Sequence, residues 1–160
     1  MTGVQTCALP IYPTINHQSL FAPLTRGEDT LTGQHANAQI PKAIGMERIY
    51  QLTGDPACGK AARFFWDLVA RTLSFVIGGH GENEFFFAPG DFATKGVASP
   101  TGPETCNTYN MIKLSRRQWL VEPSAALADF IERSLYNHIL PSQEPERGGF
   151  VYFTSMRPGH

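Results

Sequence analysis

The residues best suited to chemistry lie in a long connection between two predicted helices, over residues 78–103. This connection opens with two glycines and a histidine and then places Glu84 directly before three phenylalanines. A carboxyl group held against apolar rings is desolvated, which raises its pKa and suits it to donate a proton near neutral pH. Glu84 is therefore the candidate general acid/base. A solvated loop acid beside a phenylalanine core anchor is the alternative interpretation, and Glu82 is a weaker rival for the catalytic role.

A second candidate site lies where the chain enters the third predicted helix. Glu104 and Cys106 flank one residue there, so their side chains can converge on one point, and the positive end of the helix dipole favours the thiolate of Cys106. A carboxylate and a thiolate are two of the usual four ligands of zinc. An ordinary buried core cysteine is the alternative for Cys106. Cys58, in a turn-like segment, is interpreted as a small structural residue.

Two histidines are further candidates. His35 lies among amide side chains at the entrance of the first predicted helix. Such a histidine either hydrogen-bonds a polar ligand, such as a sugar hydroxyl, or caps the loop structurally, and the residues alone favour neither role. His138 lies on a helix face and is interpreted as structural.

Helical periodicity predicts four helices that must position these side chains. They run over about residues 41–52, 56–73, 105–120 and 124–140. A loop is expected over residues 13–33, and short strands are expected around residues 74–77 and 150–153. This order is typical of stacked helical hairpins. About six such hairpins close into an α/α barrel, which needs roughly 200 residues or more, so the chain is expected to hold about two of them.

The overall composition is that of a globular chain. Of 160 residues, 42% are hydrophobic and 17% are charged, which excludes disorder as the main state. Thirteen basic and fourteen acidic residues give a net charge of -1, so we expect neither nucleic acid nor a membrane as a partner. No apolar run approaches the roughly 18 residues that a membrane-spanning helix needs. Three cysteines are too few for a disulfide framework.

Both ends of the chain have unusual features. Residues 1–12 lack the features of a secretion signal, and TGVQTCALPI from Thr2 resembles the in-frame translation of a sequencing-adapter oligonucleotide. We expect a non-native tail in which Cys7 has no role; a native but uninformative tail is the alternative. Residues 148–153 indicate a turn into a strand without a closing element after it. We therefore expect a reading frame clipped from a longer gene, with residues 13–160 as part of a catalytic domain, and we predict no localisation.

Four ordered blocks of the sequence resemble one family, the beta-L-arabinofuranosidases of glycoside hydrolase family 127. The blocks are LTGQHANAQIPKAIG from Leu31, FVIGGHGENEFF from Phe75, GPETCNTYNMIKLSRR from Gly102 and ERSLYNHILPSQEPERGGFVYFTSMRPGH from Glu132. The resemblance implies a mainly α fragment of an (α/α)6 barrel with short β-hairpins. It also implies retaining hydrolysis of terminal beta-L-arabinofuranosyl residues, with a zinc-bound cysteine thiolate as the nucleophile.

Mapped onto this sequence, the resemblance implies that Glu84 is the general acid/base, that His35 contacts the substrate and that Glu104 and Cys106 bind zinc. The other zinc ligands of the family are adjacent cysteines, one of them the nucleophile, and this sequence has no such pair. We therefore expect an incomplete zinc site and an inactive 160-residue chain. The implied partners are arabinose-containing plant glycans.

Two other hypotheses stay open at this point. One is a hydrolase of the same family that acts on another plant-glycan sugar, because the residues that set specificity are largely absent from this piece of sequence. The other is a non-catalytic helical scaffold that kept the fold and lost the nucleophile.

Overall fold

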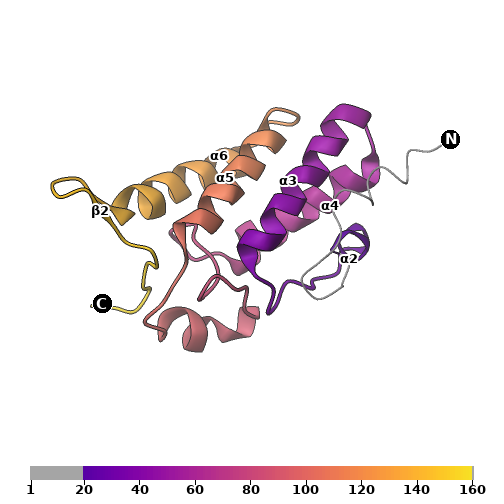
Figure 1. The fold of residues 1–160 in the computed structure, drawn as a ribbon. Coiled ribbons are helices and arrows are strands. Elements are labelled where there is room, and N and C mark those ends of the chain that lie inside the picture. The colour runs from indigo at the N-terminus through magenta and orange to yellow at the C-terminus, as the bar shows by residue number, and fades with distance from the viewer. Residues whose placement is uncertain (1–19, 160) are drawn as a thin grey trace.

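The computed structural model describes residues 20–159 as two helical hairpins that lie side by side (Figure 1). The first hairpin consists of α3 (Ala36–Thr53) and α4 (Pro56–Leu68). The second consists of α5 (Thr105–Trp119) and α6 (Ala125–Ser134), and α3 packs against α5 where the hairpins meet. None of the helices in this described part of the chain combines the length and apolar character needed to cross a bilayer. The expected tail, with Cys7, lies outside the described residues.

Side-chain caps set the starts of α4 and α6. Asp55 accepts a hydrogen bond from the backbone two residues further on, and Ser124 accepts one from the backbone three residues further on. Both helices continue as a π-helical turn, over Val69–Leu73 and Leu135–Ile139. These extensions give the two helices nearly the lengths that the apolar periodicity predicts, and the prediction for α5 is confirmed to within one residue.

The predicted start of the first helix, at Pro41, is wrong. α3 begins at Ala36, whose backbone N–H donates to the Glu84 carbonyl at 2.8 Å. This long-range hydrogen bond satisfies one of the four N–H groups that a helix start leaves without a partner, so the helix can begin before the proline. Pro41 stands inside the helix, and Gly54 ends it in a left-handed conformation.

The prediction of a loop over residues 13–33 is wrong for part of its length. α2 (Phe21–Arg26) lies within it and packs against α4, while residues 13–19 lie outside the described residues. Leu20 and Leu24 are buried in the core, at 4% and 0% exposure. Tertiary burial of these two leucines stabilises a helix whose six residues have little propensity to form one alone.

Short strands occur only near the C-terminus of the described residues. β1 (Gln143–Glu144) pairs antiparallel with β2 (Gly149–Phe150), which covers the first part of the expected strand over residues 150–153. The expected strand around residues 74–77 is reduced to a single bridge between Ser74 and His80.

The core lies between the two hairpins. The indole N–H of Trp66 donates to Ser115 Oγ at 2.7 Å across the hairpin interface, and the Trp66 ring meets Phe130 edge to face at 5.9 Å. Cys58 is fully buried in this core, which agrees with its interpretation as a structural residue. Aromatic and aliphatic contacts therefore hold the two hairpins in a fixed relation.

The connection over residues 78–103 lies across one end of both hairpins (Figure 1). Its anchor is His80, which is completely buried and stacks on Phe86 with 5.5 Å between ring centroids. Burial, and secondarily the charge of His138, lowers the pKa of His80 to about 3, so its imidazole is neutral at physiological pH. The connection is thus a packed segment that can hold a side chain in place.

Candidate active site

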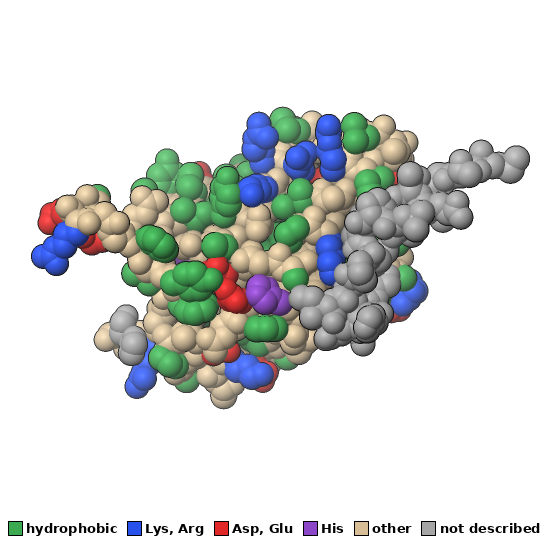
Figure 2. All heavy atoms as spheres, in the orientation of Figure 1, with side chains coloured by type: hydrophobic (Ala, Val, Ile, Leu, Met, Phe, Trp, Pro, Cys, Tyr) green, Lys and Arg blue, Asp and Glu red, His purple; other side chains and the backbone are tan. Residues whose placement is uncertain are grey.

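Glu84 and His35 are brought together by a short antiparallel pairing. Backbone hydrogen bonds of 2.8 to 2.9 Å join residues 33–36 to residues 84–86, with His35 opposite Phe85. Across this pairing His35 Nε2 lies 3.1 Å from Glu84 Oε2, and each side chain is 28% exposed. In Figure 2 a histidine adjoins acidic side chains near the middle of the face, with hydrophobic side chains beside them. The structure therefore joins two of the predicted site residues at the surface.

The backbone at Glu84 has an unusual conformation. Asn83 and Glu84 form a tight turn closed by mutual hydrogen bonds of 2.9 and 3.0 Å between Glu82 and Phe85. Their φ angles are 47° and 70°, as in a type I′ turn, where glycine usually takes the second position. A left-handed glutamate costs roughly 1–2 kcal/mol, and such strain is concentrated at functional sites. The turn presents the Glu84 side chain to His35 and Tyr152.

Glycine at position 84 is expected to give a more stable protein than alanine. Both Glu84→Gly and Glu84→Ala remove the same carboxylate contacts, but only alanine keeps the left-handed strain at φ 70°. The glycine variant is expected to exceed the alanine variant by about 1 kcal/mol in free energy of unfolding, measured by urea denaturation. Equal stabilities would show that the turn relaxes in both variants and carries no strain.

The physical reason given for Glu84 from the sequence is wrong. Phe86 and Phe87 are buried at 2% and 4% exposure and pack into the core, so they do not surround the carboxyl group. The groups that hydrogen-bond the Glu84 carboxylate are polar, namely His35 and Tyr152. Its position next to the rings reflects the turn, in which Phe86 and Phe87 anchor the loop while the Glu84 side chain stays 28% exposed.

Glu82, the rival of Glu84, has a different environment. Its Oε1 accepts hydrogen bonds of 2.9 to 3.0 Å from the side chains of Asn83, Ser99 and Thr101. A carboxylate that accepts three hydrogen bonds in this way ties the connection together. The geometry therefore favours Glu84 for acid/base chemistry.

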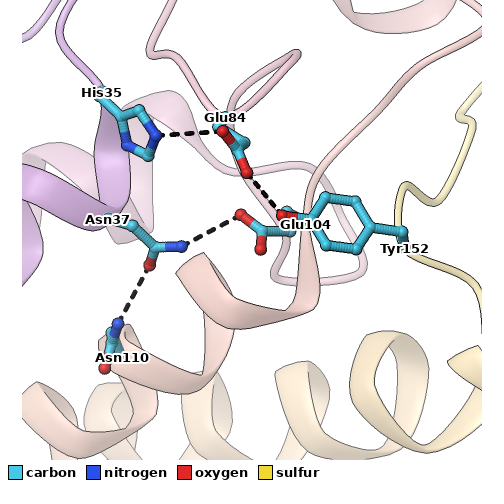
Figure 3. Close-up of polar contacts among 6 residues, drawn as sticks. All are labelled: His35, Asn37, Glu84, Glu104, Asn110 and Tyr152. Carbon is cyan, nitrogen blue, oxygen red and sulfur yellow. Dashed lines mark hydrogen bonds and ion pairs between the residues drawn. The ribbon is translucent and has the colours of Figure 1, made fainter.

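Tyr152 is a site residue that the sequence reasoning missed. Its hydroxyl donates to Glu84 Oε1 at 2.6 Å, and Figure 3 shows its ring beside Glu104. Hydrogen bonding to Glu84, and then to Glu104, raises the pKa of Tyr152 above its usual range. One phenol thus connects the two carboxylates. The alternating residues around it predicted a strand and gave no sign of this contact.

Glu104 and Cys106 lie together, as their spacing predicts. Glu104 is buried at 2% exposure, at the N-cap position of α5, and Cys106 is exposed in the first turn. The alternative of a buried core cysteine is therefore wrong. The expected thiolate is also wrong: a hydrogen bond to Glu104, with burial and the negative charge of that carboxylate, raises the pKa of Cys106 to about 11. The adjacent carboxylate outweighs the helix dipole.

Glu104 and Cys106 are suitable for two of the four ligand positions of a zinc site. A carboxylate oxygen and a thiol sulfur are groups that zinc accepts as ligands. Within residues 20–159, however, no group of three or more histidine, cysteine or acidic side chains is arranged so that it could hold a metal ion. Glu104 and Cys106 could thus supply two ligands of a metal ion, which would require others from outside this pair.

Two asparagines near Glu104 were also missed. Asn37 Nδ2 donates to Glu104 Oε2 at 3.1 Å, and Asn110 Nδ2 donates to Asn37 Oδ1 at 3.0 Å (Figure 3). Both asparagines lie on helices, Asn37 in the first turn of α3 and Asn110 in α5. The packing of α3 against α5 brings them together, and single-helix periodicity cannot predict that contact.

His138 has the structural role that its helix position predicts. It is buried at 1% exposure, and its Nδ1 lies 2.8 Å from Thr108 Oγ1 of α5. Burial lowers the pKa of His138 to about 4. His138 therefore joins the π-helical end of α6 to α5 as a neutral side chain.

The geometry defines a helical-hairpin domain with a site built from two carboxylates, a histidine, a tyrosine and a thiol. The chain belongs to the family described as Beta-L-arabinofuranosidase, GH127 catalytic domain, whose sequence model matches residues 12–160. No curated protein matches the chain at a significant level.

Solved structures with similar folds include two from the same family. One is a GH127 beta-L-arabinofuranosidase from Geobacillus stearothermophilus T6, with 24% identity and a TM-score of 0.65. The other is the GH127 beta-arabinofuranosidase BT3674, with 24% identity and a TM-score of 0.69. Each match covers 83% of this chain and 20% of the other, so the chain spans about a fifth of their length. The expected fold class, a mainly α fragment of an (α/α)6 barrel with short β-hairpins, is confirmed.

Proposed function

We propose that this chain is part of a retaining glycoside hydrolase that releases terminal beta-L-arabinofuranosyl residues from arabinose-containing plant glycans. The observation that carries the proposal is the cluster in which Glu84 contacts His35 and Tyr152 beside Glu104 and Cys106. Family membership supports it, because a carbohydrate is the substrate class of a glycoside hydrolase. We propose that His35, which lies 3.1 Å from Glu84, contacts the substrate.

Glu84 acts as the general acid/base in this proposal. Its carboxyl group first protonates the leaving glycosidic oxygen, and its carboxylate then takes a proton from the water that releases the sugar. His35 holds Oε2 and Tyr152 holds Oε1, so the carboxyl group has a fixed orientation. A fixed orientation matters because proton transfer requires a donor within hydrogen-bond reach of the oxygen.

Glu104 and Cys106 would hold zinc, together with ligands that this sequence does not contain. When bound, zinc lowers the pKa of coordinated thiols and so supplies a thiolate nucleophile at neutral pH. The 160 residues contain Cys7, Cys58 and Cys106 and no adjacent cysteine pair. The 160-residue chain alone is therefore proposed to be inactive, because the nucleophile of the family is not among its residues.

The test measures hydrolysis of an aryl beta-L-arabinofuranoside by two proteins. The longest reading frame that contains this sequence is expected to release the aryl group, and the 160-residue chain is expected to release none. Zinc content of the longer protein is measured by mass spectrometry, with one zinc ion per chain expected. A longer protein that folds without turning over any arabinofuranoside would favour the scaffold hypothesis. Turnover by the 160-residue chain that Glu84→Gln abolishes would contradict the proposed inactivity.

A further inference from the structure

Three hydrogen bonds in series connect an exposed cation to the buried Glu104. Lys113 Nζ donates to Asn110 Oδ1 at 3.2 Å, and Asn110 Nδ2 donates to Asn37 Oδ1 at 3.0 Å. Asn37 Nδ2 then donates to Glu104 Oε2 at 3.1 Å. Figure 3 shows the last two of these contacts. We call the series Lys113, Asn110 and Asn37 the amide relay; every donor in it points toward the carboxylate.

The charges at its two ends determine the direction of the relay. A carboxylate only accepts hydrogen bonds, so Asn37 must turn its NH2 group toward Glu104 and its carbonyl oxygen toward Asn110. An ammonium group only donates, so Asn110 must turn its carbonyl oxygen toward Lys113. Both ends therefore require the same orientation of the two amides. Reversal of either amide would place oxygen against oxygen at one of its contacts and donor against donor at the other.

The helices hold the members of the relay in place. Asn110 and Lys113 lie three residues apart on α5, which places them on one face, and Asn37 faces them from α3. The Lys113 ammonium also lies 4.3 Å from the centre of the Tyr109 ring, a cation–π contact that restricts the lysine. The relay thus spans the α3–α5 interface from the solvent to a residue that is 2% exposed.

We infer that the amide relay positions Glu104 to bind a cation. Hydrogen bonds that end on a charged group are the strong ones, and bonds in series polarise one another, so Lys113 strengthens the contact of Asn37 with Glu104 without touching it. This contact fixes the rotamer and plane of a carboxylate that stands beside Cys106. Lys113, Asn110 and Asn37 are positioning residues. The inference rests on the proposed function only in taking zinc as the cation.

The first test is metal-free and uses NMR spectra of the 160-residue chain. Lys113→Met is expected to shift the side-chain amide signals of both asparagines and to broaden the range of Glu104 conformers, measured by three-bond couplings of its β protons. Lys113→Arg keeps a donating cation and is expected to restore both readouts. A shift at Asn110 with no change at Asn37 or Glu104 would overturn the inference, because Lys113 would then act only on its neighbour.

Lys42→Met is the matched control. Lys42 donates to the Gln39 amide oxygen at 3.0 Å, and Gln39 donates to Gln34 at 3.3 Å, a similar series that ends on an amide. Its loss is expected to leave the Asn37 signals and the Glu104 couplings unchanged. If Lys42→Met moved them as much as Lys113→Met does, general loss of positive charge would explain the effect and the relay would be refuted.

The second test makes the same substitutions in the longest reading frame that contains this sequence, adds zinc ions alone and measures affinity by competition with a chromophoric chelator. Asn37→Ala is expected to weaken zinc binding about 10-fold, and Lys113→Met by a smaller factor that shrinks at high salt. Unchanged affinity in Asn37→Ala would overturn the positioning role. If the unaltered longer protein binds no zinc, the zinc site of the proposed function fails, while the Glu104 couplings of the 160-residue chain still decide whether the relay positions that carboxylate.

Discussion

Glu84→Gln is expected to lower kcat of the whole enzyme by roughly 100- to 10,000-fold. Glutamine keeps the size of the side chain and can still bond Tyr152 and His35, but it carries no proton to give to the leaving oxygen. The loss should be largest for substrates with poor leaving groups, since these depend most on protonation. The measurement is kcat for a series of aryl beta-L-arabinofuranosides whose phenols differ in pKa.

Glu82→Gln is the control for this series. Its carboxylate tethers Ser99 and Thr101 and does not hydrogen-bond the site residues, so kcat should change by less than about 10-fold, with the same leaving-group dependence as the unaltered enzyme. If Glu82→Gln shows the steep leaving-group dependence and Glu84→Gln does not, the acid/base assignment passes to Glu82.

Gly78→Ala is expected to destabilise the fold by about 3 kcal/mol. A methyl group at this position would overlap the side chain of Ser134 and lie 2.8 Å from its Cα, and φ at Gly78 is 87°. Neither the α6 backbone nor the start of the connection can yield easily, because both are packed. The free energy of unfolding, measured with urea on the purified variant, checks the prediction.

Gly54→Ala separates the cost of steric overlap with Ser134 from the cost of backbone strain at a positive φ. Gly54 also has a left-handed φ, 73°, but an added Cβ would meet no atom within 4 Å. Its replacement should therefore cost only the backbone strain, about 1 kcal/mol. Equal losses in Gly78→Ala and Gly54→Ala would mean that Ser134 moves aside and that the contact between the connection and α6 is loose.

The sequence predicts α4 and α6 well because each of these helices carries its own local start signal. Asp55 before Pro56 and Ser124 before an apolar stripe are start signals that need no tertiary information. The start of α3 has no such signal, since it depends on a hydrogen bond to Glu84, a residue far away in the sequence. The wrong start at Pro41 follows directly from that dependence.

The candidate site could be predicted only in part. Glu84 and Glu104 stand in sequence blocks that resemble the family, so the resemblance identifies them as candidate site residues. It does not reveal which side chains surround them. The desolvated carboxyl and the helix-activated thiol both failed as physical arguments. The phenylalanines next to Glu84 in sequence were taken for its surroundings, whereas Tyr152 hydrogen-bonds it; the Glu104 carboxylate next to Cys106 was taken for a fellow ligand, whereas it also raises the pKa of that thiol.

The contacts of the site also bear on the order of folding. His35 with Glu84, Asn37 with Glu104, and Tyr152 with Glu84 are separated by 49, 67 and 68 residues. Closing loops of this length carries an entropic cost before any contact compensates it, so these pairs are expected to form late, after each hairpin has its local structure. A collapsed intermediate would then show nearly native helix content and no site, and arrival of the Tyr152 phenol at Glu84 would mark the last step of folding.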